Sequence, residues 1–144
     1  MCNTWCYPFD GPAGRSAQVY KSRMFNKWAS KEGLGDAALM TAVNEMERGL
    51  IDAELGGHVV KKRVVLGGRG KRGGVRVMIA YKAEHNVFFV YGFAKNDRAN
   101  ISDDELRALK NLARELLGAS EKAIANAVKS GALFEVENRG RESR

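Results

Sequence analysis

Positive charge is concentrated in one stretch of the chain, in residue types that bind phosphate. Of the 24 Lys and Arg residues, eight lie between Leu55 and Ala83, where there is no Asp or Glu. The remaining 16 basic and 17 acidic residues carry a net charge of −1, although the whole chain carries +7. Such a local excess is typical of a site for a polyanion. The eight residues are Lys61, Lys62, Arg63, Arg69, Lys71, Arg72, Arg76 and Lys82.

Five glycines lie among these cations, at positions 67, 68, 70, 73 and 74. Because glycine allows the backbone to approach a partner closely, we expect Arg69, Lys71 and Arg72 to bind phosphate groups from this loop. The alternative is a long hairpin loop that its charges keep soluble. The pattern is not a nucleotide-binding P-loop, because GxxxxGK must be followed by Ser or Thr where Arg72 stands.

Clustered cations suit cleavage of RNA without a metal. In that reaction a 2′-hydroxyl attacks the adjacent phosphate, which leaves a 2′,3′-cyclic phosphate and a 5′-hydroxyl. Arginine can stabilise the phosphorane, because its planar fork meets two phosphate oxygens and stays charged. A base is also needed, yet no His, Asp or Glu lies between Lys61 and Lys82. A lysine crowded by other cations, such as Lys61, can serve instead.

The sequence predicts neither a metal site nor a cofactor. Cys2 and Cys6 form one pair without a second pair or a neighbouring His, which is too little for zinc. His58 and His85 form no cluster with other ligands. No stretch of about 20 apolar residues could span a membrane, and the first residues lack the features of a signal peptide. We therefore expect a cytoplasmic protein that does not bind membranes.

The length of 144 residues favours one domain. We expect it to cover residues 17–137, after a disordered leader at 1–16 and before a disordered polar tail at 138–144. The predicted fold class is α+β, in which a helical hairpin packs on a small antiparallel sheet and helices follow at the C-terminal end.

A short strand at residues 19–21 and two helices are predicted first. Ser22 can cap a helix that ends at Gly33, and Asp36 can cap the next one. Each helix has one apolar stripe, so the two form a helical hairpin. The stripes are Met24, Phe25, Trp28 and Ala29, and then Leu39, Val43, Met46 and Leu50.

Three strands are predicted next, at residues 61–66, 75–82 and 87–94. The third is apolar on both faces, so we expect it to be central and covered on one face by the helical hairpin. Because loops and not helices join these strands, for instance a turn at 83–86, they should be antiparallel.

The C-terminal third is predicted to be mainly helical. Ser102 to Glu105 has the pattern of a capping box. The helix that follows has one apolar face, made of Leu106, Leu109, Ala113, Leu116 and Leu117. Ser120 begins a short helix that ends near Gly131, and a final strand is predicted at 132–137.

This order of elements, with a basic loop before the second of the three strands, resembles the RelE/ParE superfamily of bacterial toxins, most closely its HigB-like RelE branch. The resemblance covers about residues 18–118. It rests on LIDAELGG (50–57), KKRV (61–64), GRGKRGGVRVMIAY (68–81), FFVYGFAKNDRANIS (88–102) and DDELRALK (103–110). It implies a fold similar to that of microbial ribonucleases. RelE members cut mRNA in the ribosomal A site without a metal and are silenced by an antitoxin encoded beside them.

The resemblance also implies catalytic roles. Lys61 and Arg63 match paired basic residues that contact the scissile phosphate, and Arg76 matches an arginine of the second strand. Ser102 stands where several RelE enzymes have a tyrosine as candidate base, and Asn96 replaces an arginine of the family's basic turn. Neither the base nor the acid is therefore assigned.

The other cations are predicted to bind RNA. They are Lys62, Arg69, Lys71 and Arg72 around the glycine-rich loop, and Lys95 and Arg98 in the turn after the third strand.

These features favour a toxin that cleaves mRNA on the ribosome and so inhibits translation. Its partners would be the ribosome, mRNA and a cognate antitoxin, a small DNA-binding protein from the adjacent gene. Two alternatives stay open. One is a ParE-like inhibitor of a protein target such as DNA gyrase, and the other is an RNA-binding module without catalytic activity.

Overall fold

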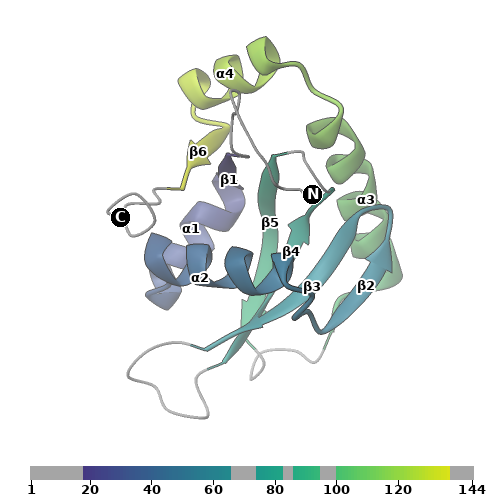
Figure 1. Ribbon diagram of the computed structural model, residues 1–144. Helices are drawn as coiled ribbons and strands as arrows, with labels where there is room; N and C mark the ends of the chain where they lie inside the picture. Colours follow the sequence, from purple (N-terminus) through teal and green to yellow (C-terminus); the bar gives the residue numbers. More distant parts are fainter. Residues whose placement is uncertain (1–17, 66–73, 83–85, 95–99, 137–144) are drawn as a thin grey trace.

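The computed structural model describes residues 18–65, 74–82, 86–94 and 100–136 (Figure 1). In chain order its elements are β1 (Val19–Ser22), α1 (Arg23–Glu32), α2 (Asp36–Glu47), β2 (Ala53–Gly56), β3 (Val59–Val64), β4 (Val75–Ala80), β5 (Val87–Ala94), α3 (Asp103–Leu117), α4 (Glu121–Ser130) and β6 (Leu133–Glu135). The predicted α+β class is confirmed. The predicted leader, the tail and most of the turn at 83–86 lie outside the described residues.

Local capping residues determine where most helices begin. The Ser22 hydroxyl accepts a hydrogen bond from the Phe25 amide, and the Ser120 hydroxyl accepts one from the Ala123 amide, each at 3.1 Å. Ser102 opens α3 as one half of a capping box. The prediction for Asp36 was wrong, because Gly35 is the N-cap of α2 and Asp36 is its first helical residue.

The strands form one six-stranded sheet in the order β2-β3-β4-β5-β1-β6. As predicted, β3, β4 and β5 are antiparallel neighbours and β5 is internal. The sheet is nevertheless mixed and larger than expected, because β1 pairs in parallel with β5, and β6 pairs antiparallel with β1. Helices α1 and α2 then carry the chain from β1 to β2 at the far edge of the sheet.

Strand β2 was not predicted. It has only four residues and pairs with β3 through a tight turn at Gly57 and His58, whose φ angles are +61° and +65°. Two consecutive positive φ angles are the mark of a type I′ hairpin turn, which matches the twist of the flanking strands.

The sheet lies between two helical layers (Figure 1). Helices α1 and α2 cover one face with a core that includes Phe25 and Leu39, and α3 and α4 cover the other with Leu109 and Ile124. Strand β5 contributes to both cores, and its register shifts after Phe89. No helix among the described residues is long and apolar enough to cross a membrane.

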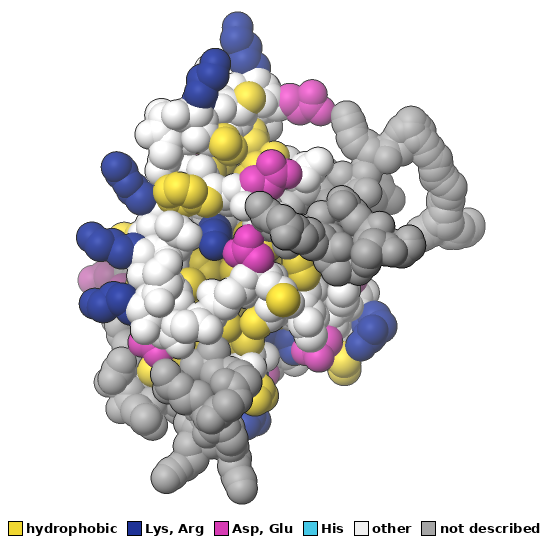
Figure 2. Space-filling model, turned by 90° about the vertical axis from the view of Figure 1, so that its left-hand side faces the viewer, with side chains coloured by type: hydrophobic (Ala, Val, Ile, Leu, Met, Phe, Trp, Pro, Cys, Tyr) yellow, Lys and Arg dark blue, Asp and Glu magenta, His cyan; other side chains and the backbone are white. Residues whose placement is uncertain are grey.

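Two residues assigned to the apolar stripes are at the surface. Met24 is 65% exposed in the first turn of α1, and Leu50 is 53% exposed beyond the end of α2. Helical spacing predicts burial only while the helix continues, which explains Leu50. Figure 2 shows apolar side chains at the surface among Lys and Arg on the side of the molecule that carries α1 and β6.

Trp28 packs directly over Gly92 of β5. A Cβ built at position 92 would overlap the six-membered ring of Trp28. The indole also contacts Phe25, with ring centroids 5.4 Å apart. The close approach of α1 to β5 therefore requires glycine at this position.

Candidate RNA-binding face

Three basic side chains share the face of the sheet on which α3 packs. Successive side chains of a strand point to opposite faces, so Lys61 and Arg63 lie on the same side of β3 as Val59, and Arg76 lies on the same side of β4 as Met78. Val59 and Met78 belong to the core beneath α3. We call the surface formed by Lys61, Arg63 and Arg76 the cationic face.

Strand pairing places these cations in two neighbouring rows. In the first row Arg63 of β3 lies opposite Arg76 of β4, and Arg76 lies opposite Phe93 of β5. The second row is Lys61, Met78 and Tyr91. Two arginines are thus side by side, with a lysine one row away. Guanidinium groups arranged in this way can bind several oxygens of one phosphate.

Arg76 forms an ion pair with Asp52. Its Nε lies 3.0 Å from Oδ2 of Asp52, and the two side chains are only 17% and 31% exposed. Arg63, by contrast, is exposed, and among the described residues no carboxylate forms an ion pair with Arg63 or Lys61. The cationic face therefore has one arginine held by a carboxylate and one that forms no ion pair among the described residues.

Lys62 lies on the opposite face of β3. It is buried, and its Nζ lies 2.8 Å from Oε1 of Glu45 on α2. Val60 and Val64, on the same side of β3, belong to the core beneath α1 and α2. This position favours a structural role for Lys62, so the cationic face does not include it.

The remaining predicted RNA-binding residues, Arg69, Lys71, Arg72, Lys95 and Arg98, lie outside the described residues. The strand ends that lead into their segments are adjacent (Figure 1), because Val64 pairs with Val75 and Val75 pairs with Ala94. Arg63 directly precedes Val64, and Arg76 directly follows Val75. Both segments are thus connected to the end of the sheet that carries the arginine row.

Strand β5 adds two aromatic side chains beside the cations. Phe93 is buried, and Tyr91 is half-buried with its ring centroid 6.4 Å from that of Phe93. The Tyr91 hydroxyl donates a hydrogen bond of 3.4 Å to Oε2 of Glu105, the capping-box residue of α3. This contact ties the start of α3 to the edge of the cationic face.

Sequence reasoning did not identify Asp52, Tyr91 or Glu105 as part of this region. Asp52 precedes a strand that was not predicted. Tyr91 follows the register shift in β5, which determines the direction of its side chain. The only signal available was the capping box, which marked Glu105 as a structural residue.

The cationic face borders one of the pockets formed by the described residues. Among the described residues, one pocket of about 220 Å³ lies between α2 and the end of β3 and has Arg63 in its lining, and another of about 370 Å³ lies at the turn between β2 and β3. Arg76 lines neither of them. The described residues contain no group of three or more His, Cys, Asp or Glu that could hold a metal ion. Several cations on one face suit a polymer with a charged backbone.

A family model described as the RelE toxin of the RelE/RelB toxin-antitoxin system matches residues 17–136. The matched region contains all ten elements and the cationic face. A comparison with curated proteins gave no significant match. The family match does not distinguish the HigB-like branch, which stays a prediction. Because the match extends over most of its length, the chain belongs to the family of RelE toxins of RelE/RelB toxin-antitoxin systems.

Proposed function

We propose that the chain is a ribosome-dependent endoribonuclease that cleaves mRNA and thereby inhibits translation. The observation that carries this proposal is the cross-strand pair of Arg63 and Arg76, with Lys61 one row away on the same face. A toxin family supplies the biological setting, and the cations supply the chemistry.

In the proposed reaction a 2′-hydroxyl loses its proton to a base and attacks the adjacent phosphorus, and the 5′-oxygen leaves and takes up a proton. Negative charge accumulates on the phosphorane in between. Arg76 and Arg63 would bind its non-bridging oxygens, and Lys61 would add a third positive charge. Arg69, Lys71, Arg72, Lys95 and Arg98 would bind neighbouring phosphates of the RNA.

Dependence on the ribosome follows from the limited chemistry of this face. Its cations stabilise charge, but its three residues include no carboxylate or imidazole base. Correct placement of the reacting groups can lower a barrier by several kcal/mol. A ribosome that holds the mRNA with its 2′-hydroxyl in line with the phosphate would supply that contribution.

The proposed partner is an antitoxin from the adjacent gene, a small DNA-binding protein. A segment rich in Asp and Glu would be attracted to the cationic face and would block access of RNA. Co-expression and co-purification test this part, and a neighbouring protein that neither binds the chain nor restores growth would contradict it. We further expect the pair to act in the cytoplasm.

Cleavage in a translating extract tests the proposed activity. The purified chain is added to a defined mRNA, and the 5′ ends of the products are mapped. We expect cuts at positions occupied by the ribosomal A site, products with 5′-hydroxyl ends, and no cuts when ribosomes are omitted. Intact mRNA that remains bound to the chain would instead indicate a non-catalytic RNA-binding module. Unbound, intact mRNA together with inhibited DNA supercoiling would indicate a gyrase inhibitor.

A further inference from the structure

The two arginines of the cationic face repel each other. Arg63 and Arg76 are directly opposite each other on neighbouring strands, and like charges in such positions repel. Arg76 is also largely removed from water, with 17% of its side chain exposed. A partly desolvated charge is costly unless it has a partner.

Asp52 supplies that partner from outside the basic stretch. It lies between α2 and β2, and its backbone amide donates a hydrogen bond of 2.8 Å to the carbonyl of Lys61 on β3. Its side chain then reaches Arg76 on β4, with Oδ2 at 3.0 Å from Nε. The carboxylate is thus anchored by its own backbone to the strand that carries Lys61 and Arg63.

The atom that Asp52 contacts determines which part of Arg76 stays available. Arginine has five N–H donors, one on Nε and four on the terminal nitrogens Nη1 and Nη2. A carboxylate at Nε restrains the guanidinium plane and leaves the terminal nitrogens for a second partner. Those nitrogens can bind two oxygens of one phosphate in the bidentate manner typical of arginine.

We propose that Asp52 is a positioning residue for the proposed RNA-cleavage reaction. It holds Arg76 by Nε, so that Nη1 and Nη2 face the scissile phosphate. Arg63, which no carboxylate among the described residues restrains, closes on the phosphate from β3. The inference rests on the proposed function, because it assigns a role within that site.

A kinetic double-mutant cycle tests the role of Asp52 in the full chain. Single-turnover cleavage rates are measured on saturating ribosome–mRNA complexes for wild type, Asp52→Asn, Asp52→Ala, Arg76→Ala and the Asp52→Ala/Arg76→Ala double variant. The matched control is Glu45→Gln, which removes the carboxylate from an ion pair of 2.8 Å on the other face of the sheet. Asp52→Asn keeps the size of the side chain and carries the test if Asp52→Ala does not fold.

We expect both Asp52 variants to cleave about 10- to 100-fold more slowly, because a misplacement of about 1 Å can cost up to about 100-fold. The half-saturating ribosome concentration should change little, and Glu45→Gln should cleave like wild type. In the Arg76→Ala background, Asp52→Ala should cause no further loss, because it acts only through Arg76. A purely structural role would instead lower the rate again in that background.

Two results overturn the inference alone: wild-type rates for both Asp52 variants, or rate losses that multiply in the double variant. A wild-type chain that cleaves no mRNA on ribosomes would overturn the proposed function, and the inference with it. The two failures are therefore distinguishable by the wild-type reaction.

Discussion

Arg63 and Arg76 are cross-strand neighbours, and only Arg76 forms an ion pair with a carboxylate among the described residues. The two arginines therefore differ in their ion pairing although they share one row. This difference leads to separate predictions for the cations of this chain.

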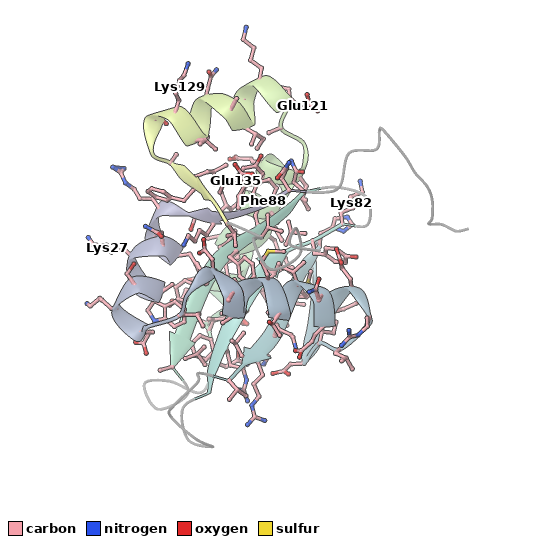
Figure 3. All side chains as sticks on the ribbon, turned by 60° about the vertical axis from the view of Figure 1, so that its left-hand side comes forward. Lys27, Lys82, Phe88, Glu121, Lys129 and Glu135 are labelled. Carbon is pink, nitrogen blue, oxygen red and sulfur yellow. The ribbon has the colours of Figure 1, made fainter. Side chains whose placement is uncertain are left out.

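Arg76 should be the most sensitive residue of the cationic face. We expect Arg76→Ala to abolish growth arrest and to slow single-turnover cleavage about 100-fold or more, because the proposed donor to the phosphorane is lost. The measurement is growth after induction at matched expression, with circular dichroism to verify folding. Lys27→Ala is a suitable control, since Lys27 is exposed on α1 across the sheet (Figure 3). Full toxicity of Arg76→Ala would contradict the placement of the site.

Lys61 and Arg63 should act with Arg76 on the rate of cleavage. We expect Lys61→Ala and Arg63→Ala each to cost about 3 kcal/mol of barrier, or ~100-fold in rate on saturated ribosomes. A charge that only binds the RNA backbone behaves differently: its removal weakens binding and lowers the salt dependence by about one unit of slope. We expect that second behaviour for Arg69, Lys71 and Arg72. Unchanged rates for both single variants would refute the proposal that Lys61 and Arg63 stabilise the phosphorane.

Lys62 should affect stability and not cleavage. We expect Lys62→Ala to lower the free energy of unfolding by about 1–3 kcal/mol, because a buried side chain and the partner of Glu45 are both lost. Chemical denaturation measures the stability, and the single-turnover rate at a temperature where the variant is folded measures the activity. A slower reaction at unchanged stability would indicate that Lys62 acts in RNA binding and not only in the fold.

Gly92 should not tolerate a larger side chain. We expect Gly92→Ala to destabilise the chain by about 1–3 kcal/mol, since the new methyl group overlaps the Trp28 ring in a packed core. Thermal unfolding measures the loss. Trp28→Leu combined with Gly92→Ala should recover part of the stability relative to the sum of the single changes. Strictly additive losses would show that the two residues do not meet.

The stability of the chain should fall at alkaline pH in part through Tyr20. Burial, followed by the negative charges of Glu135 and Glu121, raises the pKa of Tyr20 above its ordinary value of 10.0. Phe88, on which the Tyr20 ring stacks at 5.5 Å, and both glutamates are labelled in Figure 3. The folded state therefore keeps the phenol proton at a pH where the unfolded state loses it, so the contribution of Tyr20 is complete below pH 10 and declines above it.

Tyr20→Phe removes this part of the dependence. Spectrophotometric titration of wild type should contain late-ionising phenolate components from Tyr20 and from Tyr81, whose pKa is raised by burial and by the charge of Glu47. The variant should lose only the Tyr20 component. The free energy of unfolding, measured with urea, should then fall less steeply with pH above pH 10 in Tyr20→Phe than in wild type. Identical slopes would contradict the assignment.

The sequence predicts those parts of the fold that depend on neighbouring residues. Ser22, Gly33, Ser102 and Ser120 mark helix ends because capping is a contact over three or four positions. The alternation in β3 likewise places Lys61 and Arg63 on one face. Their partners could not be predicted in the same way.

Contacts between distant segments account for what was missed. The ion pair of Asp52 with Arg76 depends on β2, whose four residues carry no clear strand pattern. The parallel pairing of β1 with β5 depends on the path of the whole chain. The direction of Tyr91 depends on a register shift that exists only when β4 and β5 are paired.

The register of β3 against β4 has a consequence for when the toxin becomes dangerous. Arg63 and Arg76 face the same way only in this alignment, and a slip of one residue would turn either strand's cations toward the opposite helices. A chain in which β3 and β4 are not yet paired carries Lys61, Arg63 and Arg76 but does not hold them on one face. Under the proposed function, toxicity would be acquired only once these two strands have paired in this register, and the producing cell would have that interval in which to supply the antitoxin.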